Sequence, residues 1–581
     1  MSTLTFLAVI AAVVVLCVVL GKKEKRRQTS AKRKQFIQEF GKPSKKVLDP
    51  ERQKSISAYF FRHPPKDAVD DTTWEDLDLS LIFQGMDRTK SAVGEEYLYA
   101  LLRSPIPQEK RQNTDSSEWG PEKERIHLTQ IRYFEEESHF EEWLMLEMAL
   151  ARLGYCGSHS IYEYLDRLDE IKEESNAKHL PAFLLPALSI VILFIHVPTG
   201  VLCLIGSLIL NMVTYYRRRG EIEPYMVSFA YLLRMLSCAD EVTKFSCEAI
   251  TKEQKALGEA KPAFAKFRRF SGVLMSGSSV SSGSPLDIIV DYVRILFHID
   301  LIKFNTMVSQ VKEKQDEIDQ ELTILGKIDT ILALSSYEKS LPYTCDPVLL
   351  DSRKKGQGIA TAYFNAKDMY HPLLDNPVPN SIETRRCILV TGSNASGKST
   401  FLKAVALCAL FAQTIGFCPA KQYEGSIFRI RTSMAHRDSI VRHESYFMAE
   451  IRSLKRIADL SCDAGEAVLC CIDEVLRGTN TVERIAASSE ILSALSQRNV
   501  LCFAATHDTE LSYLLEDQFD NRHFEETLIN RDITFSYRLK PGKSQTRNAI
   551  ALLSEAGFDE EITKKAKKRA EEFEQTGQWK K

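Results

Sequence analysis

The sequence has no excess of either charge. Its 581 residues hold 76 Lys and Arg against 78 Asp and Glu, a formal net charge of −2. No global field therefore recruits nucleic acid, and any basic surface must be local. The sequence also lacks a C-x-x-C pair among its 13 cysteines, several of which lie in apolar runs. This excludes the usual zinc-site spacing and indicates reduced, buried thiols in a cytosolic body.

Two stretches lack charged residues altogether, and the first is residues 1–21. Phe6 to Leu20 is unbroken apolar sequence, and Lys22 to Arg27 supplies a basic cluster directly after it. A cleaved signal peptide has its basic residues before the apolar run. The pattern therefore predicts an N-terminal transmembrane anchor, with the N-terminus outside and the following chain in the cytoplasm.

The second uncharged stretch is residues 180–216. It is interrupted at 196–200 and closed by Arg217, Arg218 and Arg219. Each arm has about 16 to 18 apolar residues, close to the roughly 20 that cross a bilayer. Both arms are apolar all round, which favours a transmembrane helical hairpin over a buried hairpin of a soluble domain. Two further crossings predict a multi-pass protein of the cell membrane, with its C-terminal part in the cytoplasm.

The remaining sequence divides by composition. Residues 22–75 are charged and predict a juxtamembrane segment attracted to anionic lipid. Residues 76–179 and 217–345 show helical periodicity and predict two parts of one all-α core and lever domain, in which 288–334 is a single long helix. From residue 346 to 581, short apolar strands alternate with helices, which is typical of an α/β domain.

One motif organises this α/β domain. Residues 392–400 fit the phosphate-loop pattern G-x-x-x-x-G-K-[ST], between a predicted strand at 387–391 and a predicted helix at 401–407. The expected nucleotide-binding residues are Gly392, Ser393, Asn394, Ala395, Ser396, Gly397, Lys398, Ser399 and Thr400. Lys398 is expected to reach the β- and γ-phosphates of ATP, and the Ser399 hydroxyl to bind Mg²⁺.

Polar residues follow two further apolar runs. Residues 467–472 lead into Asp473 and Glu474, and residues 501–506 lead into His507. Because the carboxyl ends of parallel strands meet at one edge of a sheet, these side chains are predicted beside the phosphate loop. Asp473 is expected to hold Mg²⁺, Glu474 to act as general base on the attacking water, and His507 to sense the γ-phosphate or steady that water.

Four motifs in this order resemble the MutS family of DNA mismatch-repair ATPases. Residues 391–400 are similar to T-G-P-N-M-x-G-K-S-T, 445–450 to S-T-F-M-x-E, 473–481 to D-E-x-G-R-G-T-S-T, and 505–507 to A-T-H. Residues 87–94, 371–372 and 549–557 also resemble family segments. The resemblance implies an ABC-like, MutS-type P-loop ATPase domain joined to the all-α core and lever domain. It also implies a homodimer in which Ser445 of one subunit faces the γ-phosphate bound by the other.

The sequence departs from the family outside the ATPase. Because residues 1–75 are predicted to hold an anchor and a charged segment, we expect no mismatch-reading domain before the core. The Ser/Gly-rich residues 276–285 leave little room for a DNA clamp, and the apolar hairpin is expected to interrupt the core. The Phe-x-Glu spelling at 134–136 matches a mismatch-reading wedge, but it lies in an apparently helical run, 131–146, and is interpreted as a core Phe134 with surface glutamates.

Two functions therefore share one predicted ATPase. In the first, a membrane-anchored MutS-like protein grips double-stranded, mismatched DNA between its levers. In the second, the same motor acts on the bilayer or on a membrane protein partner without DNA. A transporter of the ABC class is disfavoured because the L-S-G-G-Q signature is absent. No DNA-binding residue is assigned, since fold-level analogy does not identify a ligand.

Overall fold

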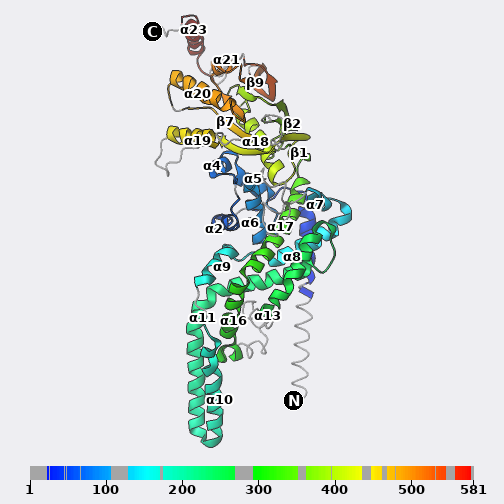
Figure 1. Ribbon diagram of the computed structural model, residues 1–581, viewed down its shortest axis with the longest axis vertical. Coiled ribbons are helices and arrows are strands. Elements are labelled where there is room, and N and C mark those ends of the chain that lie inside the picture. The colour runs from blue at the N-terminus through cyan, green and yellow to red at the C-terminus, as the bar shows by residue number, and fades with distance from the viewer. Residues whose placement is uncertain are drawn as a thin grey trace, which may run out of the picture. The chain divides into compact units, whose positions relative to one another are not determined.

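The chain folds into two compact units (Figure 1). One unit comprises residues up to 64 together with 86–100 and 117–340, and the other comprises 65–85, 101–116 and 341 onward. The computed structural model describes residues 23–576, with gaps at 25, 45, 47–48, 66, 106–127, 171–173, 269–291, 351–361, 394–395, 435–445, 461–466, 478, 530–531 and 545–556. The predicted N-terminal anchor lies outside the described residues.

The first unit is helical, as the periodicity of its sequence predicts. Its central helix, α17, is buried from Glu321 to Glu338. The α-helices that belong wholly or mainly to this unit are α2 (Pro50–Ser55), α3 (Ala58–Arg62), α6 (Ala92–Arg103), α7 (Leu128–Tyr133), α8 (Phe140–Leu153), α9 (Ile161–Glu170), α10 (Leu180–Ile195), α11 (Val197–Val242), α12 (Thr251–Ala260), α13 (Ala265–Arg268), α16 (Ile299–Glu313) and α17 (Gln315–Glu338).

Two predicted helices of this unit are broken. The described part of the run predicted as one helix over 288–334 is interrupted twice: by a turn at residues 297–298, where His298 has a left-handed φ of 53°, and at Lys314, between α16 and α17. Residues 312–317 carry no apolar side chain that could pack in a hydrophobic core. The run 131–146 is interrupted by a turn at Phe134. Phe134 is fully buried, which confirms its interpretation as a core residue.

The hairpin forms at the predicted place. Helices α10 and α11 lie side by side and meet at His196 (Figure 1). A Cβ at Gly200 would overlap the backbone of Leu193, so the turn requires glycine there. The second arm does not end at the predicted boundary after residue 216, because α11 continues without a break to Val242.

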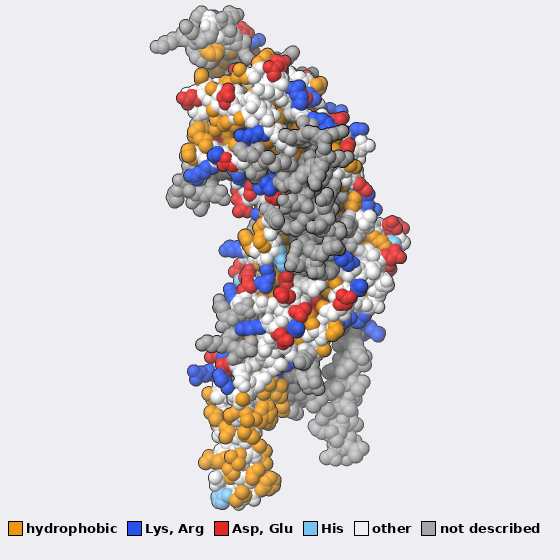
Figure 2. Space-filling view, viewed as in Figure 1, with side chains coloured by type: hydrophobic (Ala, Val, Ile, Leu, Met, Phe, Trp, Pro, Cys, Tyr) orange, Lys and Arg blue, Asp and Glu red, His pale blue; other side chains and the backbone are white. Residues whose placement is uncertain are grey.

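The hairpin exposes apolar side chains on all sides. Hydrophobic side chains cover the free part of α10 and α11 (Figure 2), and Phe194, Ile195 and Leu202 are between 73% and 86% exposed. An 18-residue window within residues 176–195 has a mean hydropathy of 1.9, and one within 197–222 has a mean hydropathy of 1.8, so both helices are long and apolar enough, by length and composition only, to cross a membrane. A continuous exposed apolar surface of this kind is typical of a site that contacts another protein or a membrane.

One buried side chain ties the root of the hairpin together. Pro186 lies inside α10 and has no N–H, so it leaves the carbonyl of Ala182 without its helical donor. Asn211 of α11 supplies one: its Nδ2 donates to Ala182 O and to Leu296 O, each at 2.9 Å. The two arms and the chain that leads into α16 are therefore fixed to one another.

The second unit contains all the strands that the structure describes. A six-stranded sheet has the order β10-β9-β4-β8-β7-β6, and a four-stranded sheet has the order β1-β5-β2-β3. The strands are β1 (Pro347–Leu350), β2 (Phe364–Met369), β3 (Asn380–Thr384), β4 (Cys387–Thr391), β5 (Gln422–Ser426), β6 (Phe428–Ser433), β7 (Ala467–Asp473), β8 (Val500–Thr506), β9 (Phe519–Ile529) and β10 (Asp532–Pro541).

The helices of this unit complete an α/β fold. They are α4 (Asp71–Asp76), α5 (Leu79–Met86), α18 (Lys398–Thr414), α19 (Tyr446–Leu460), α20 (Thr481–Ser496), α21 (Leu511–Leu514) and α23 (Glu560–Thr576). The strands predicted at 387–391, 467–472 and 501–506 are confirmed as β4, β7 and β8, and all three are fully buried and mutually parallel. Continuous apolar sequence forms such strands because both faces of the sheet are covered.

Residues 65–85 belong to this unit rather than to a juxtamembrane segment or a helical core. Their α4 packs against β6, the edge strand of the six-stranded sheet. Acidic side chains of the segment meet basic side chains of the sheet and its helices, which composition could not reveal.

Candidate nucleotide-binding site

Three parallel strands bring the predicted site residues to one edge of the sheet. Thr391 of β4 pairs with Thr506 of β8, and Asp473 of β7 pairs with Ala505 of β8. The residues that follow these strands are therefore neighbours: the phosphate loop after β4, Glu474 after β7 and His507 after β8. The structure thus assembles, from three distant segments, the group that the sequence predicts.

The phosphate loop requires glycine at both ends. Gly392 has a φ of 148° and Gly397 a φ of 105°, in the region that side chains disfavour. A Cβ at Gly392 would lie 3.0 Å from the carbonyl oxygen of Phe524. Asn394 and Ala395 lie outside the described residues. Helix α18 begins directly after Gly397, so its free N–H groups and its dipole face the loop and favour an anion there.

Lys398 is the basic side chain of the loop. It is buried, and its Nζ donates to the carbonyl oxygens of Gly392 at 2.7 Å and Ser393 at 2.8 Å. The Ser396 hydroxyl donates to Ser393 O at 2.8 Å, which closes the loop on itself. The ammonium is therefore held inside the loop, where phosphate oxygens would replace the carbonyls as acceptors.

Ser399 and Asp473 form a donor set for a hard cation. The Ser399 hydroxyl donates to Asp473 Oδ2 at 2.5 Å, while Asp473 Oδ1 is buried and makes no hydrogen bond to the residues that the structure describes. A hydroxyl and a carboxylate with a free oxygen, beside a phosphate loop, fit Mg²⁺, which takes few protein ligands and completes its shell with phosphate and water.

Glu474 lies in a strained turn at the end of β7. Glu474 has a φ of 54° and Leu476 a φ of 59°, rare values for residues with side chains. The Glu474 carboxylate is paired with His507 Nε2 and with Arg477 Nε. Burial alone would raise the pKa of Glu474, but the hydrogen bond and charge of His507 and the charge of Arg477 outweigh it and lower this pKa. The carboxylate therefore stays ionised, as a general base must.

His507 joins this carboxylate to the phosphate loop. Its Nδ1 donates to Gly392 O at 3.0 Å, and its Nε2 faces Glu474. The next residue, Asp508, forms a bidentate ion pair with Arg484 of α20 at 2.9 and 2.6 Å. The ring is thus held between the loop and the base, as its predicted role in steadying water requires.

A pocket of about 450 Å³ extends from the phosphate loop. Tyr537, from β10, lies on its wall, and a Cβ at Gly397 would be 3.2 Å from this ring. Asn380 holds Tyr537 in place: its Nδ2 donates to Tyr537 O at 2.9 Å and its Oδ1 accepts from Leu539 N at 2.7 Å. An aromatic ring beside a triphosphate site suits a purine base. No motif in the sequence marks Tyr537 or Asn380.

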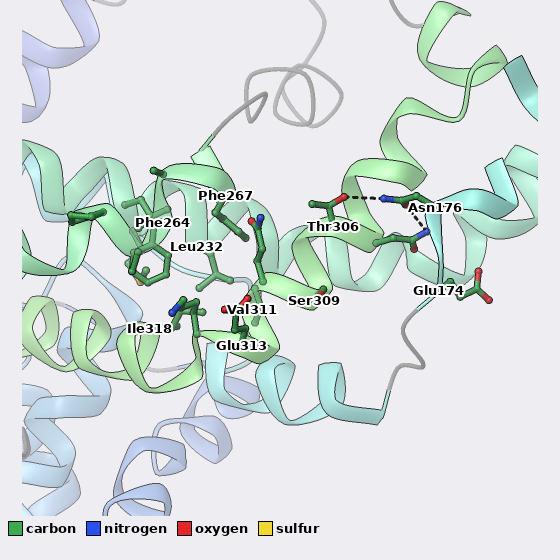
Figure 3. Close-up of a pocket in the computed structure, with 18 of the residues that line it drawn as sticks. Glu174, Asn176, Leu232, Phe264, Phe267, Thr306, Ser309, Val311, Glu313 and Ile318 are labelled. Carbon is green, nitrogen blue, oxygen red and sulfur yellow. Dashed lines mark hydrogen bonds between the residues drawn. The ribbon is translucent and has the colours of Figure 1, made fainter. Parts of the chain in front are cut away.

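A larger cavity, of about 630 Å³, lies within the helical unit (Figure 3). Phe264, Phe267 and Leu232 lie on one side of it, and Thr306 and Asn176 lie on the other (Figure 3). Its lining includes none of the residues that the sequence predicts for nucleotide binding or hydrolysis. The catalytic chemistry that the sequence predicts therefore belongs to the smaller pocket.

Ser445 lies outside the described residues, so its predicted role at a neighbouring subunit stays a prediction. The same motif also contains Glu450, at the start of α19, whose Oε1 accepts from the backbone N–H of Leu476. Burial raises the pKa of Glu450. The motif therefore reaches the turn of Glu474 within the subunit, in addition to any contact across a dimer.

The parallel sheet, the phosphate loop and the carboxylates at the strand ends define a P-loop, nucleotide-binding ATPase domain. Residues 388–574 match the family described as MutS domain V. The chain is also 32% identical over 202 residues to the DNA mismatch repair protein MutS from each of two strains of Thermus thermophilus. That similarity covers 34% of this chain and 24% of the length of each relative. The ATPase domain is therefore similar to domain V of MutS.

Proposed function

We propose that this chain is a membrane-anchored MutS-like ATPase that hydrolyses ATP in a dimer and couples hydrolysis to movement of its helical levers. The observation that carries the ATPase part is the convergence of Lys398, Ser399, Asp473, Glu474 and His507 at one sheet edge. The similarity to MutS over the ATPase domain supports the same activity.

The roles follow from the geometry. Lys398 would neutralise charge on the β- and γ-phosphates of ATP, and Ser399 and Asp473 would hold Mg²⁺, which would supply positive charge to offset that of the phosphates. Glu474, kept ionised by His507 and Arg477, accepts a proton from the attacking water. His507 orients that water relative to the phosphate loop.

Steady-state ATP hydrolysis by the full-length chain tests this proposal. Glu474→Gln removes the base but keeps the shape, and is expected to lower kcat by about 10²- to 10⁴-fold without weakening ATP binding. Lys398→Ala is expected to abolish binding. Glu516→Gln, an acid-to-amide change at an exposed residue of the same domain, is the matched control. Equal turnover by Glu474→Gln and Glu516→Gln would refute the assignment.

The proposed dimer rests on the family resemblance at residues 445–450. Sedimentation of the Glu474→Gln chain with ATP and Mg²⁺ is expected to show a dimer, since nucleotide is bound and not consumed. Ser445→Ala is expected to weaken that dimer and to lower kcat. A monomer that hydrolyses ATP at the normal rate would exclude the composite site.

The exposed hairpin supports a membrane location, with the N-terminus outside and the ATPase domain in the cytoplasm. Uncovered Phe194, Ile195 and Leu202 at the free end, and Arg217 and Arg218 near the root, suit a span with a cytoplasmic basic collar. In intact cells, Thr199→Cys at the hairpin tip is expected to react with a membrane-impermeant maleimide, and Asp459→Cys only after permeabilisation. Equal labelling of both before permeabilisation would exclude this topology.

Two partners are proposed as alternatives. The mismatch-repair function in the relatives' name favours mismatched double-stranded DNA, whereas the near-neutral charge and the exposed hairpin favour a membrane or membrane-protein partner. Binding of the full-length Glu474→Gln chain to mismatched and matched duplexes over a salt series separates them. Saturable, nucleotide-dependent binding that weakens steeply with salt supports DNA. Intact ATP hydrolysis with no duplex binding supports the membrane alternative.

A further inference from the structure

An acidic segment binds the edge of the ATPase sheet. We call residues 65–85 the acidic clasp; its contacts are made chiefly by Asp67, Asp70, Asp76 and Asp78. The clasp belongs to the ATPase unit, although residues 64 and 86, to which its ends are joined, belong to the helical unit. Its α4 lies against β6, the last strand of the six-stranded sheet. The outer N–H groups of an edge strand need partners, and the clasp supplies them.

Asp76 and Thr73 satisfy the end of β6. The Thr432 N–H donates to Thr73 Oγ1 at 3.3 Å, and the Thr432 hydroxyl donates to Asp76 Oδ2 at 2.7 Å. The N–H of Met434 donates to the same Asp76 oxygen at 3.0 Å. Asp76 is buried. These contacts fix the part of β6 that pairs with the end of β7, where Ser433 lies opposite Ile472.

Asp70 extends the grip to α19. It caps α4 by accepting from Thr73 N at 2.8 Å, and its carboxylate also pairs with Arg431 Nε at 2.9 Å and Arg456 Nη1 at 2.5 Å. Arg456, on α19, donates in turn to Thr432 O at 2.6 Å. One carboxylate and one guanidinium therefore join the clasp, β6 and α19.

Helix α19 reaches the catalytic turn. Its Glu450 accepts a hydrogen bond from the backbone of Leu476, two residues after Glu474. Both Glu474 and Leu476 have left-handed backbone conformations. Such strain persists only where surrounding contacts determine it, and the hydrogen bond from Leu476 to Glu450 is one of these contacts. A shift of α19 would release the turn that aims Glu474.

We propose that Asp70 and Asp76 are positioning residues for ATP hydrolysis: they hold β6 and α19, and through Glu450 they fix the turn that carries Glu474. The proposal rests on the proposed ATPase function and names a regulatory input to its site. Because both ends of the clasp continue into the helical unit, a displacement of those ends changes how firmly Glu474 is aimed.

The clasp also touches the helix of the phosphate loop. Asp78 pairs with Lys403, on the second turn of α18, and both lie near His371, which lines the nucleotide pocket. Burial, and then the charge of Lys403, lower the pKa of His371 to about 4, so this imidazole is neutral at pH 7. The acidic clasp thus contacts β6 and α19 through Asp70 and Asp76, and the helix of the phosphate loop, α18, through Asp78.

Matched alanine variants of α4, measured for ATP turnover and nucleotide affinity, test the proposal. Asp76→Ala in the full-length chain is expected to lower kcat about tenfold while nucleotide affinity changes less than about twofold, because the base and not the phosphate loop is misplaced. Asp76→Asn keeps an oxygen acceptor and is expected to retain most of kcat. Asp71→Ala is the control, since Asp71 is on the same helix but is 83% exposed and contacts Arg103.

A double variant tests the route. If Asp76 acts through α19 and Glu450, Asp76→Ala combined with Glu450→Ala is expected to be no more than about twofold slower than Glu450→Ala alone. If instead the loss of kcat in the double variant is the product of the two single losses, Asp76 and Glu450 act independently and the proposed route is wrong. A kcat of Asp76→Ala equal to that of Asp71→Ala would overturn the proposal itself, as would an equal loss of kcat and nucleotide affinity.

Hydrogen exchange separates this proposal from the ATPase assignment. Without nucleotide, Asp76→Ala is expected to speed amide exchange in residues 446–460 and at Leu476, and Asp71→Ala is not. If the wild-type chain does not hydrolyse ATP, the proposed function is refuted. The exchange difference would still show that Asp76 holds α19 and the turn after β7. Unchanged exchange in both variants would refute the clasp whatever the activity.

Discussion

Replacing Gly94 with alanine should destabilise the helical unit, although alanine is the better helix former. Gly94 lies in α6, where the chain passes the buried carboxylate of Asp329 on α17. A Cβ at position 94 would be 2.6 Å from Asp329 Cβ and closer still to its carboxylate. That carboxylate accepts from Lys90 N at 3.0 Å and Ser91 N at 2.8 Å, and also from the Ser91 hydroxyl.

The magnitude follows from what must move. Overpacking a buried site costs about 1–3 kcal/mol. Displacing Asp329 also loses at least one hydrogen bond to a charged group, about 1.5–3 kcal/mol. Alanine in place of glycine within a helix returns about 0.5–1 kcal/mol. The expected net loss is about 2–5 kcal/mol of unfolding free energy, a large part of the 5–15 kcal/mol typical of a domain.

Native-state hydrogen exchange of the α17 amides measures this loss within the helical unit, without assuming that the whole chain unfolds in one step. Gly258→Ala is the control: Gly258 is in α12 of the same unit, and an added Cβ meets no atom within 4 Å. It should slow exchange slightly or leave it unchanged. If Gly94→Ala behaves like Gly258→Ala, α6 and Asp329 are not packed as the structure shows.

Three further predictions concern the nucleotide site. His507→Ala removes a contact that lowers the pKa of Glu474. Because a base with a raised pKa is protonated at higher pH, the acid limb of the kcat–pH profile should move to higher pH. An unmoved limb would show that His507 does not control the protonation of Glu474. Tyr537→Ala should weaken binding of ATP and ADP several-fold but leave binding of inorganic triphosphate unchanged, as measured by calorimetry, whereas equal losses would place Tyr537 away from the base. Asp473→Asn should raise the Mg²⁺ concentration needed for half-maximal turnover at least tenfold, and an unchanged requirement would remove it from the metal site.

The core of the nucleotide site could be predicted because its information is local. Residues 387–407 contain a strand, a glycine loop and a helix in direct succession, and parallel pairing brings Asp473 and His507 to the same edge. Tyr537 could not be predicted, because its place beside the loop depends on distant contacts such as that with Asn380, 157 residues earlier in the chain. No periodicity or motif marks such a pair.

The acidic clasp shows the same limit more strongly. The sequence predicts residues 65–75 as the end of a juxtamembrane segment and 76–85 as the start of the helical core, since composition does not show where a carboxylate finds its partner. Asp70 finds Arg431 and Arg456 more than 350 residues away. The sequence does not predict the break at Lys314, for a related reason. Apolar residues recur at helical spacing on both sides of it, and the six polar positions between them do not by themselves indicate a break.

The course of α11 bears on how a membrane and this chain could affect each other. The sequence predicts a domain boundary after residue 216, where apolar residues give way to Arg217–Arg219. Instead, α11 runs as one helix from Val197 to Val242. Asn211 ties it to the chain entering α16, and Tyr215 donates to the buried Asp300 at 3.0 Å. The hairpin and the helical unit therefore share one continuous, braced helix, so a force on the hairpin tip reaches the helical core directly.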